Sequence, residues 1–389
     1  MKNHKVRKTS LKKNIFSTIL FLWFLFITGK HCFGGDLQRF IFEETVMSIP
    51  ARIIICAENE SDAKSAANAV FQRFDELNKI MSDYDSDSEV MRICQIGAKS
   101  GEPVQVSNDL FRVLQFSKQI SIASDGAFDV TIGPVIRLWR RARRLRALPE
   151  KELLDNARQL VGNALWEIDE KSQTVTLKRD KMRFDLGGVA KGDAIDQAVE
   201  VLKTHKIPAA LVDVGGDIRS YGQPPTHSAN SEKIIPNIQN SKISKIQNEN
   251  DSGVNSWIIG VSANGQAICH VAAQDVAMAS SGDAERFVEW DGVRYSHIVD
   301  PKTGLGLTDH KAVTVFAKDA ITADALASAL SILPPEKGLK LLEQYEGTAA
   351  MICRKISRLP DAKNHSPVSQ SETEFFYSPN WKNLNFQTP

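Results

Sequence analysis

Residues 295–304, YSHIVDPKTG, bring an imidazole, a carboxylate, a proline and a glycine together within a short segment. Histidine has an ordinary pKa of about 6.5, so His297 is the side chain here that is best suited to move a proton at neutral pH. Pro301 and Gly304 favour a turn, which predicts that the segment lies on a loop. The pattern indicates acid–base chemistry by His297 beside Asp300, with a purely structural histidine as the alternative.

A carboxylate and a hydroxyl stand four residues apart in the segment 318–333, KDAITADALASALSIL. The segment is rich in helix formers, which predicts a helix with Asp319 as its N-cap. Asp324 and Ser328 then share one helix face. Two hard oxygens at this spacing suit Mg²⁺, which takes few protein ligands. An aspartate on an ordinary surface helix is the alternative.

The segment 185–196, DLGGVAKGDAID, places a carboxylate, two glycines and a lysine where a strand gives way to a helix. Glycine lets a ligand approach the backbone, free amides at a helix start attract anions, and Lys191 adds a positive charge. We therefore expect a phosphate or diphosphate site, with a structural glycine turn and a surface lysine as the alternative. In a second turn, 215–217, Asp217 either caps the turn or binds a ligand.

The elements that position these residues mix α and β along the whole chain. Apolar residues recur at helical spacing from 61 to 81, while short apolar runs rich in β-branched residues indicate strands. The pattern predicts helices at 61–81, 108–123 and 187–205, and strands at 51–57, 174–178, 209–214 and 257–261.

Two segments have compositions that do not favour a packed core. Residues 223–256 are rich in Asn, Ser, Gln and Pro and lack an apolar period, so we expect a low-complexity surface insertion. The tail 360–389 is similarly polar, and we expect it to be loosely ordered. The folded domain is therefore expected to span 36–359.

The N-terminus has the order of an export signal. Six basic residues precede position 14, and the apolar run 15–29 is shorter than the roughly 20 residues that span a bilayer comfortably. We expect residues 1–35 to be a cleaved signal peptide, with a retained membrane anchor as the alternative. The protein is then exported, either periplasmic or on the periplasmic face of the inner membrane.

Composition excludes several other functions. With 389 residues, 42% hydrophobic and 24% charged, the chain has the composition of a folded globular protein, and its net charge of +1 argues against nucleic acid as a partner. The four cysteines outside the signal form no CxxC pair, so a thiolate metal site is not expected, and buried thiols are favoured. The six arginines of 137–146 indicate a solvated face, or else contact with an anionic membrane or ligand phosphate.

Seven stretches, in order, make the chain similar to the ApbE family of FAD:protein FMN transferases. The resemblance covers about 47–350, with 223–256 as an insertion. The stretches are MSDYDSDSE at 81–89, GAFDVTIGPVIRLW at 126–139, DLGGVAKGDAID at 185–196, LVDVGGDIRSYG at 211–222, ASSGDAERF at 279–287, YSHIVDPKTG at 295–304 and AVTVFAKDAITADALASAL at 312–330.

This resemblance implies a fold and an activity. The fold is mixed α/β (α+β), T-fold-like and two-lobed, with FAD in the cleft between the lobes and magnesium beside its diphosphate. The activity is magnesium-dependent transfer of FMN from FAD to a threonine hydroxyl of an acceptor protein, a membrane redox subunit, with release of AMP. The export signal agrees with that setting.

The resemblance also implies roles for single residues. His297 is the candidate base, with Asp300 and the Pro301 turn holding the direction of its imidazole. FAD contacts are implied at Met47, Tyr84, Ala127, Phe128, Asp129, Asp185, Lys191 and the backbone of Ile298. Magnesium ligands are implied at Gly188 through its main-chain oxygen and at Asp324 and Ser328 through their side chains, with the backbone of Ala327 nearby.

The sequence departs from the family's usual motifs at three places. Ser328 stands where threonine is usual, and keeps the hydroxyl; Leu305-Gly306-Leu307 replaces a proline-bearing sequence; and arginines follow Trp139 where a glycine-bearing loop is usual. The last two departures bear on the choice of acceptor. Two other functions fit the same residues: an FAD diphosphatase that yields FMN and AMP, and a non-catalytic periplasmic flavin-binding protein.

Overall fold

The computed structural model describes residues 37–225, 232–236, 256–263, 265–282, 287–357 and 371–387. Within them, the largest sheet has nine strands in the order β16-β15-β14-β11-β7-β6-β2-β1-β8. Neighbouring strands are antiparallel except β1 and β8, which are parallel. The strands are β1 (Gln38–Val46), β2 (Ile49–Ala57), β6 (Ala209–Val214), β7 (Asp217–Tyr221), β8 (Glu232–Pro236), β11 (Ala277–Gly282), β14 (His310–Ala317), β15 (Ala349–Ser357) and β16 (Ser371–Tyr377).

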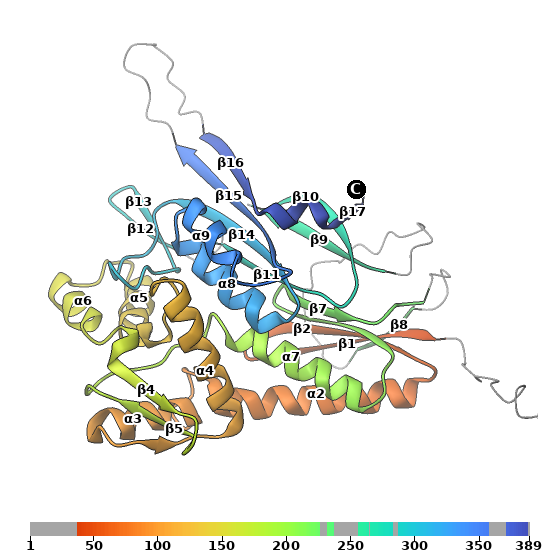
Figure 1. Cartoon of the computed structure of the whole chain (residues 1–389), viewed down its shortest axis with the longest axis horizontal. Helices are drawn as coiled ribbons and strands as arrows, with labels where there is room; N and C mark the ends of the chain where they lie inside the picture. Colours follow the sequence, from red (N-terminus) through yellow and green to blue (C-terminus); the bar gives the residue numbers. More distant parts are fainter. Residues whose placement is uncertain are drawn as a thin grey trace, which may run out of the picture. The chain divides into compact units, whose positions relative to one another are not determined.

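Helices cover one face of this sheet (Figure 1). Strand β2 shows why both faces are buried, because Ile53 and Ile55 join the core under the helices while Ile54 joins the core on the opposite face. The covering helices are α2 (Glu60–Met81), α7 (Ala190–Thr204) and α8 (Ala320–Ile332), and α9 (Pro335–Leu342) packs on α8.

A second sheet packs on the other face. It contains β9 (Trp257–Ala263), β10 (Gln266–Ala273) and β17 (Asn385–Gln387). Trp257 and Val271 from this sheet share a core with Phe316 of the large sheet. The 3₁₀ helix η3 (Pro379–Asn383) adds Trp381 to the same core.

The remaining elements flank the large sheet near one end of the helices (Figure 1). Two helices pack with a small sheet: α3 (Glu89–Ser100), α4 (Asn108–Ala123), β3 (Val104–Gln105), β4 (Trp166–Asp169) and β5 (Thr174–Leu177), with η2 (Asn163–Leu165) before β4. Beside them, Trp139 and Val299 belong to a separate small core. That core is built from η1 (Val130–Ile132), α5 (Gly133–Leu145), α6 (Lys151–Arg158), β12 (Phe287–Trp290) and β13 (Val293–Ser296).

Most expected elements are confirmed. Helices α2, α4 and α7 and strands β2, β5, β6 and β9 lie where the sequence pattern predicts them, and Asp319 is the N-cap of α8 as expected. The structure is the expected mixed α/β fold. The described residues from Gln38 onward belong to one compact unit.

Two segments differ from their expected lack of order. Within 223–256, residues 232–236 form β8 against β1, since Ile234 and Ile235 have high β-propensity. Within 360–389, residues 371–387 form β16, η3 and β17. Trp381 is 8% exposed in the core between the sheets, so this part of the tail completes the fold.

The expected export signal at 1–35 lies outside the described residues. Among the residues that the structure does describe, no helix is both long enough and apolar enough to cross a membrane. Cys56, Cys94 and Cys353 are buried, and Cys269 is half-buried. Burial raises the pKa of the Cys56 thiol to about 12 and that of Cys94 to about 11, so both are inert at neutral pH.

Candidate active site

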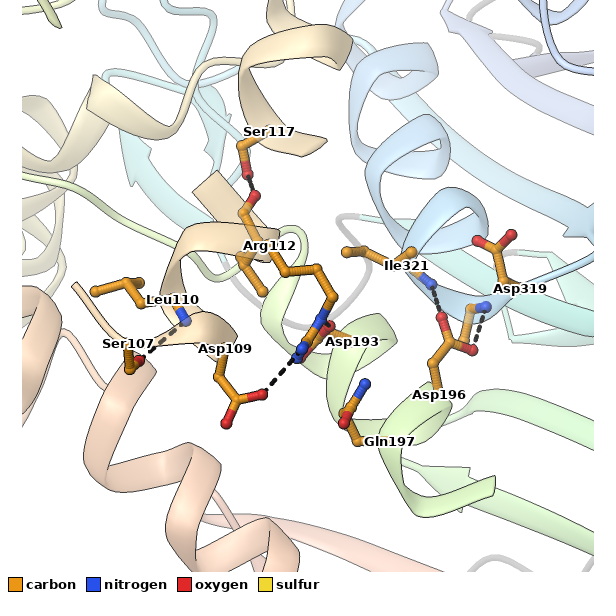
Figure 2. A network of polar contacts seen from close by, with 12 residues as sticks. Ser107, Asp109, Leu110, Arg112, Ser117, Asp193, Asp196, Gln197, Asp319 and Ile321 are labelled. Carbon is orange, nitrogen blue, oxygen red and sulfur yellow. Dashed lines mark hydrogen bonds and ion pairs between the residues drawn. The ribbon is translucent and has the colours of Figure 1, made fainter. Parts of the chain in front are cut away.

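Helices α7 and α8 are held together by carboxylates that bond each other's N-terminal amides. Asp196 of α7 accepts hydrogen bonds from the amides of Ala320 at 2.8 Å and Ile321 at 2.9 Å (Figure 2). In return, Asp324 of α8 accepts one from the amide of Gly192 at 3.1 Å. Because carboxylates satisfy free amides and favour the positive end of a helix dipole, the register of the two helices is fixed.

Gly192 permits this crossing because it has no side chain. A Cβ there would lie 2.6 Å from the Cα of Ile321, which is backbone and cannot give way. On its far side, α7 is anchored to α4 by Arg112, whose Nε and Nη2 donate to Asp193 at 2.9 and 3.0 Å (Figure 2). Asp109 joins the same network, accepting from Arg112 Nη1 at 2.9 Å.

Three charged groups meet at the start of α7. The Lys191 ammonium pairs with the buried carboxylate of Asp217, which begins β7, and lies 3.8 Å from Oδ1 of Asp324. Asp217 is itself fixed by the amide of Ser280 at 3.1 Å. Burial raises the pKa of Asp324 to about 7, opposed by Lys191 and reinforced by the nearby Asp217 charge.

The hydroxyl of Ser328 lies one turn along α8 and faces the glycine turn before α7. A Cβ on Gly188 would come within 2.8 Å of Ser328 Oγ and 3.3 Å of Phe128 Cε2, so these three residues converge. Ser328 Oγ makes no hydrogen bond to any residue in the described ranges. Ala327 beside it is buried in the main core.

This arrangement fits a divalent cation with few protein ligands. Among the described residues, no three His, Cys, Asp or Glu side chains cluster as a metal site. Asp324 nevertheless supplies a buried carboxylate that shares the single Lys191 ammonium with Asp217, and Ser328 adds an uncommitted hydroxyl. Hard oxygens in this number suit Mg²⁺, which keeps several waters.

The GAFD stretch adjoins this site. Ala127 and Phe128 are buried, and the Phe128 amide donates to Ser124 Oγ at 3.0 Å. Asp129 is also buried, and its carboxylate accepts from the amide of Thr131 at 2.8 Å and its hydroxyl at 2.6 Å. Burial raises the pKa of Asp129. The described contacts of Asp129 are with the local turn and with the Ser121 hydroxyl of α4 at 3.5 Å, and its nucleotide contact stays a prediction.

His297 is exposed and directly follows β13, on the expected loop. Lys302, also in this loop, pairs with Asp125, two residues before Ala127 of the GAFD stretch. Trp139 of α5 donates its indole N–H to the Gly304 carbonyl at 2.8 Å. These contacts bind the loop to α5 and to the segment that leads to Phe128.

The backbone around His297 is fixed by several hydrogen bonds. The amide of Ile298 donates to Ser296 Oγ at 3.0 Å, and its carbonyl accepts from Leu307 at 2.9 Å. The carboxylate of Asp300 accepts from the amide of Lys302 at 2.8 Å. Asp300 thus shapes the turn, and any effect on the imidazole's direction passes through the backbone. The roles of His297, Asp300 and Ile298 stay predictions.

The two residues expected at the flavin end lie on turns. Met47 (φ 50°) and Ser48 (φ 63°) form the two-residue turn between β1 and β2. The adjacent Pro50 carbonyl accepts from the Gly215 amide at 3.0 Å, which brings the Met47 turn close to Asp217. Tyr84 follows α2 and is 78% exposed.

Asp185 lies at the glycine turn, where it accepts from the Gly187 amide at 2.9 Å. Burial raises the pKa of Asp185, and the nearby Asp83 charge adds to the effect. Arg140 of α5 donates to Asp185 Oδ2 at 2.8 Å, and its guanidinium also lies against Tyr84. The structure therefore brings Tyr84 and Asp185 together around Arg140.

Sequence reasoning did not select two residues of this site. The sequence does not distinguish capping from binding for Asp217, and only the β6–β7 hairpin reveals that it meets Lys191. Arg140 was one of six neighbouring arginines with no signal that set it apart.

Comparisons with known proteins agree with the fold and the motif order. The family model described as "ApbE family" matches residues 45–352. The FAD:protein FMN transferase of Treponema pallidum is 30% identical over 319 residues, covering 79% of this chain and 82% of that protein. The flavin transferase ApbE from Vibrio cholerae superimposes with a TM-score of 0.71 at 25% identity, covering 90% of this chain and 99% of the other. The Pseudomonas stutzeri flavinyl transferase ApbE in its apo form gives a TM-score of 0.70 at 25% identity, covering 90% and 97%.

Proposed function

Because the chain belongs to the ApbE family, we propose that it is an FAD:protein FMN transferase. It moves FMN from FAD to a threonine hydroxyl of an acceptor protein and releases AMP. The observation that best supports this proposal is the α7–α8 crossing. There Lys191 Nζ lies 3.8 Å from Asp324 Oδ1, beside the turn at Gly188, which has no side chain to block a ligand. A diphosphate needs such positive charge and close backbone approach.

Asp324 and Ser328 would hold magnesium through their side-chain oxygens and Gly188 through its main-chain oxygen, with the backbone of Ala327 nearby. Bound there, it would neutralise charge on the diphosphate oxygens and so make phosphorus more open to attack. Support for this ligand set comes from the buried carboxylate of Asp324, which shares the Lys191 ammonium with Asp217. Further support comes from the Ser328 hydroxyl, which faces Gly188 and makes no hydrogen bond to any residue in the described ranges.

In the transfer step, the threonine oxygen attacks the phosphorus of the FMN half. A new bond forms between this oxygen and phosphorus, and the bond from phosphorus to the bridging oxygen breaks, so AMP leaves with the electron pair. His297 accepts the threonine proton; it is exposed, so a protein substrate can reach it. Lys191 stabilises negative charge on the diphosphate and on the departing AMP.

FAD lies across the molecule from the glycine turn to α5. The adenosine and diphosphate portion contacts Ala127, Phe128, Asp129, Lys191 and the backbone of Ile298, while Met47 and Tyr84 contact the flavin side. Asp185, which the resemblance assigns to the nucleotide pocket with Lys191, shares Arg140 with Tyr84 and so reaches the flavin side. Support comes from Phe128, which adjoins both Gly188 and Ser328, and from the shared contact of Tyr84 and Asp185 with Arg140.

The acceptor is a membrane redox subunit with an exported threonine segment, and the enzyme acts in the periplasm or on the periplasmic face of the inner membrane. Support for this setting is the basic and then apolar order of residues 1–35.

The test is incubation of the chain with FAD, magnesium and the exported threonine-bearing domain of such a subunit. We expect covalent flavin fluorescence on the acceptor in a denaturing gel, together with one AMP released for each flavin attached. A threonine-to-valine acceptor is the matched control and must stay dark.

Other outcomes identify the alternatives. FMN and AMP without labelled acceptor indicate an FAD diphosphatase, in which water replaces threonine. Bound but unchanged FAD indicates a flavin-binding protein, and either result would overturn the proposed transfer.

A further inference from the structure

One of the six arginines in 137–146 has surroundings unlike the others. Five are exposed on α5 or at its end and make no ion pair with any residue in the described ranges: Arg137, Arg141, Arg143, Arg144 and Arg146. The side chain of Arg140 is only 23% exposed and pairs with two carboxylates. The arginine run is therefore a solvated helix face from which one member turns inward.

Arg140 joins two segments that are far apart in the sequence. One terminal nitrogen pairs with Asp83, in the loop after α2, and the other donates to Asp185 Oδ2 at 2.8 Å. The Asp83 and Asp185 side chains are 10% and 11% exposed. A planar guanidinium holds two carboxylates in a fixed fork geometry, whereas a lysine ammonium is a point charge that imposes no such planar arrangement.

The same guanidinium lies against the ring of Tyr84. Its Cζ is 4.2 Å from the ring centroid, within cation–π distance. Tyr84 is nevertheless 78% exposed, so most of the side chain stays open. Arg140 supports the aromatic ring and leaves it free to stack with a planar ligand.

Arg183 braces this arrangement from behind. Its Nη2 donates to the backbone carbonyl of Asp83 at 2.6 Å, which fixes the loop that carries Tyr84. Burial raises the pKa of Asp185, the Asp83 charge raises it further, and Arg140 opposes both effects. Without Arg140, two buried carboxylates would repel each other beside the glycine turn.

We propose that Arg140 is a positioning residue for the flavin half of FAD: it braces the Tyr84 ring and the Asp185 carboxylate in the arrangement that receives the isoalloxazine ring. The inference rests on the proposed function. It assigns Arg140 a role in FAD affinity and flavin stacking, since its described contacts are with Asp83, Asp185 and Tyr84 and include neither Lys191 nor Asp324. Arg140 can therefore position the flavin, whereas the five exposed arginines of the run make no contact within the described residues that would let them do so.

The test compares Arg140→Gln with Arg144→Gln in the full chain. Both variants remove one guanidinium from α5, but Arg144 is exposed and makes no ion pair in the described structure. FAD affinity is measured by calorimetry, and the stacking of flavin on Tyr84 by quenching of FAD fluorescence. We expect Arg140→Gln to weaken FAD binding about 10- to 100-fold, as loss of charged hydrogen bonds does, and to relieve part of the quenching.

Further readouts separate positioning from a merely structural role. In Arg140→Gln the KM for FAD rises, while kcat at saturating FAD changes less than about threefold. Arg140→Lys keeps the charge but not the bridge, so its affinity should be intermediate. Combining Arg140→Gln with Tyr84→Leu should cost less than the sum of the single changes, because both disturb one stack.

Several results would overturn the inference. Equal FAD affinity and quenching in Arg140→Gln and Arg144→Gln would do so, as would strict additivity with Tyr84→Leu. If Arg140→Gln does not fold, wild-type affinity and quenching in folded Arg140→Lys would overturn it equally. A wild-type chain that binds no FAD would instead remove the proposed function, and this inference with it.

Discussion

The α7–α8 crossing and the surface around α5 hold the side chains of the candidate site in different ways. At the crossing, Asp324 and Ser328 stand on a buried helix whose N-terminal amides are bonded by carboxylates. Its C-terminal carbonyls accept from Lys311 at 3.3 Å. Around α5, by contrast, Tyr84 and His297 are exposed and lie on turns.

This difference coincides with where the sequence is expected to depart from the family's usual motifs. The arginines after Trp139 and the Leu305-Gly306-Leu307 sequence both belong to the α5 side, while the crossing keeps its motifs with one exchange of threonine for Ser328. The comparison teaches that the side chains proposed to hold the cation and diphosphate are fixed by buried contacts between helices. The side chains proposed to meet the flavin and the acceptor are exposed and are positioned by turns.

The largest effect is expected at the crossing, from Asp324→Ala. It removes the one proposed carboxylate ligand of magnesium and a bond to the Gly192 amide. We expect transfer to fall by more than roughly 10²-fold, as when one charge-stabilising group is lost. Magnesium titration of the transfer rate checks this, with Asp324→Asn as a variant that keeps one oxygen. An unchanged magnesium titration would contradict the ligand assignment.

On the α5 side, His297→Ala tests the candidate base. We expect FAD to bind as tightly as in the wild type, while the single-turnover rate of transfer falls about 10²- to 10⁴-fold. His205→Ala, at the exposed C-terminal end of α7, is the matched control and should keep full activity. Normal transfer by His297→Ala would remove His297 from the base role.

A smaller effect tests whether the crossing is as tightly built as its contacts indicate. Gly192→Ala places a Cβ 2.6 Å from Ile321 Cα, so α7 and α8 must separate. We expect a loss of about 1–3 kcal/mol in the free energy of unfolding, measured with urea, together with weaker magnesium binding. In Gly260→Ala the new Cβ would have its nearest neighbour at 3.6 Å, so this control should be nearly neutral. Equal stability of the two variants would show that the crossing can relax.

The smallest effect is a pH dependence at the same crossing. Burial raises the pKa of Asp196 to about 6, despite Arg219 and two amides. The unfolded value is about 3.9, so the folded protein takes up this proton first as the pH falls. Relative to Asp196→Asn, the wild type should therefore gain roughly 2 kcal/mol of stability between pH 7 and pH 4 and lose it again as the pH rises through 6. A constant difference across that range would contradict the shifted pKa.

Local pattern was sufficient to predict much of the local structure at the candidate site. The four-residue spacing of Asp324 and Ser328 and the cap at Asp319 predicted α8 and its polar face, and the glycines near 187 predicted a close approach at the start of α7. These signals are short in range, because helix periodicity and caps are set by neighbouring residues.

Contacts between distant segments were beyond such reasoning. Asp217 meets Lys191 only through the β6–β7 hairpin, and Arg140 bridges two loops, at Asp83 and Asp185, that are far apart in the sequence. Likewise, residues 371–387 carry five aromatic side chains among mostly polar residues, but only the fold shows that Trp381 joins a core with residues of β9, β10, β14 and other strands of the large sheet. No local pattern specifies partners at that separation.

The central claim is that the α8 oxygens and the His297 loop act on one FAD molecule. The most direct test is a crystal structure of the chain with FAD and Mn²⁺ in place of magnesium. The account predicts an anomalous peak bound by Asp324 and Ser328, next to the FAD diphosphate, with the His297 imidazole on the same diphosphate's open side. A metal peak elsewhere, or FAD bound with His297 on the opposite side of the protein, would contradict it.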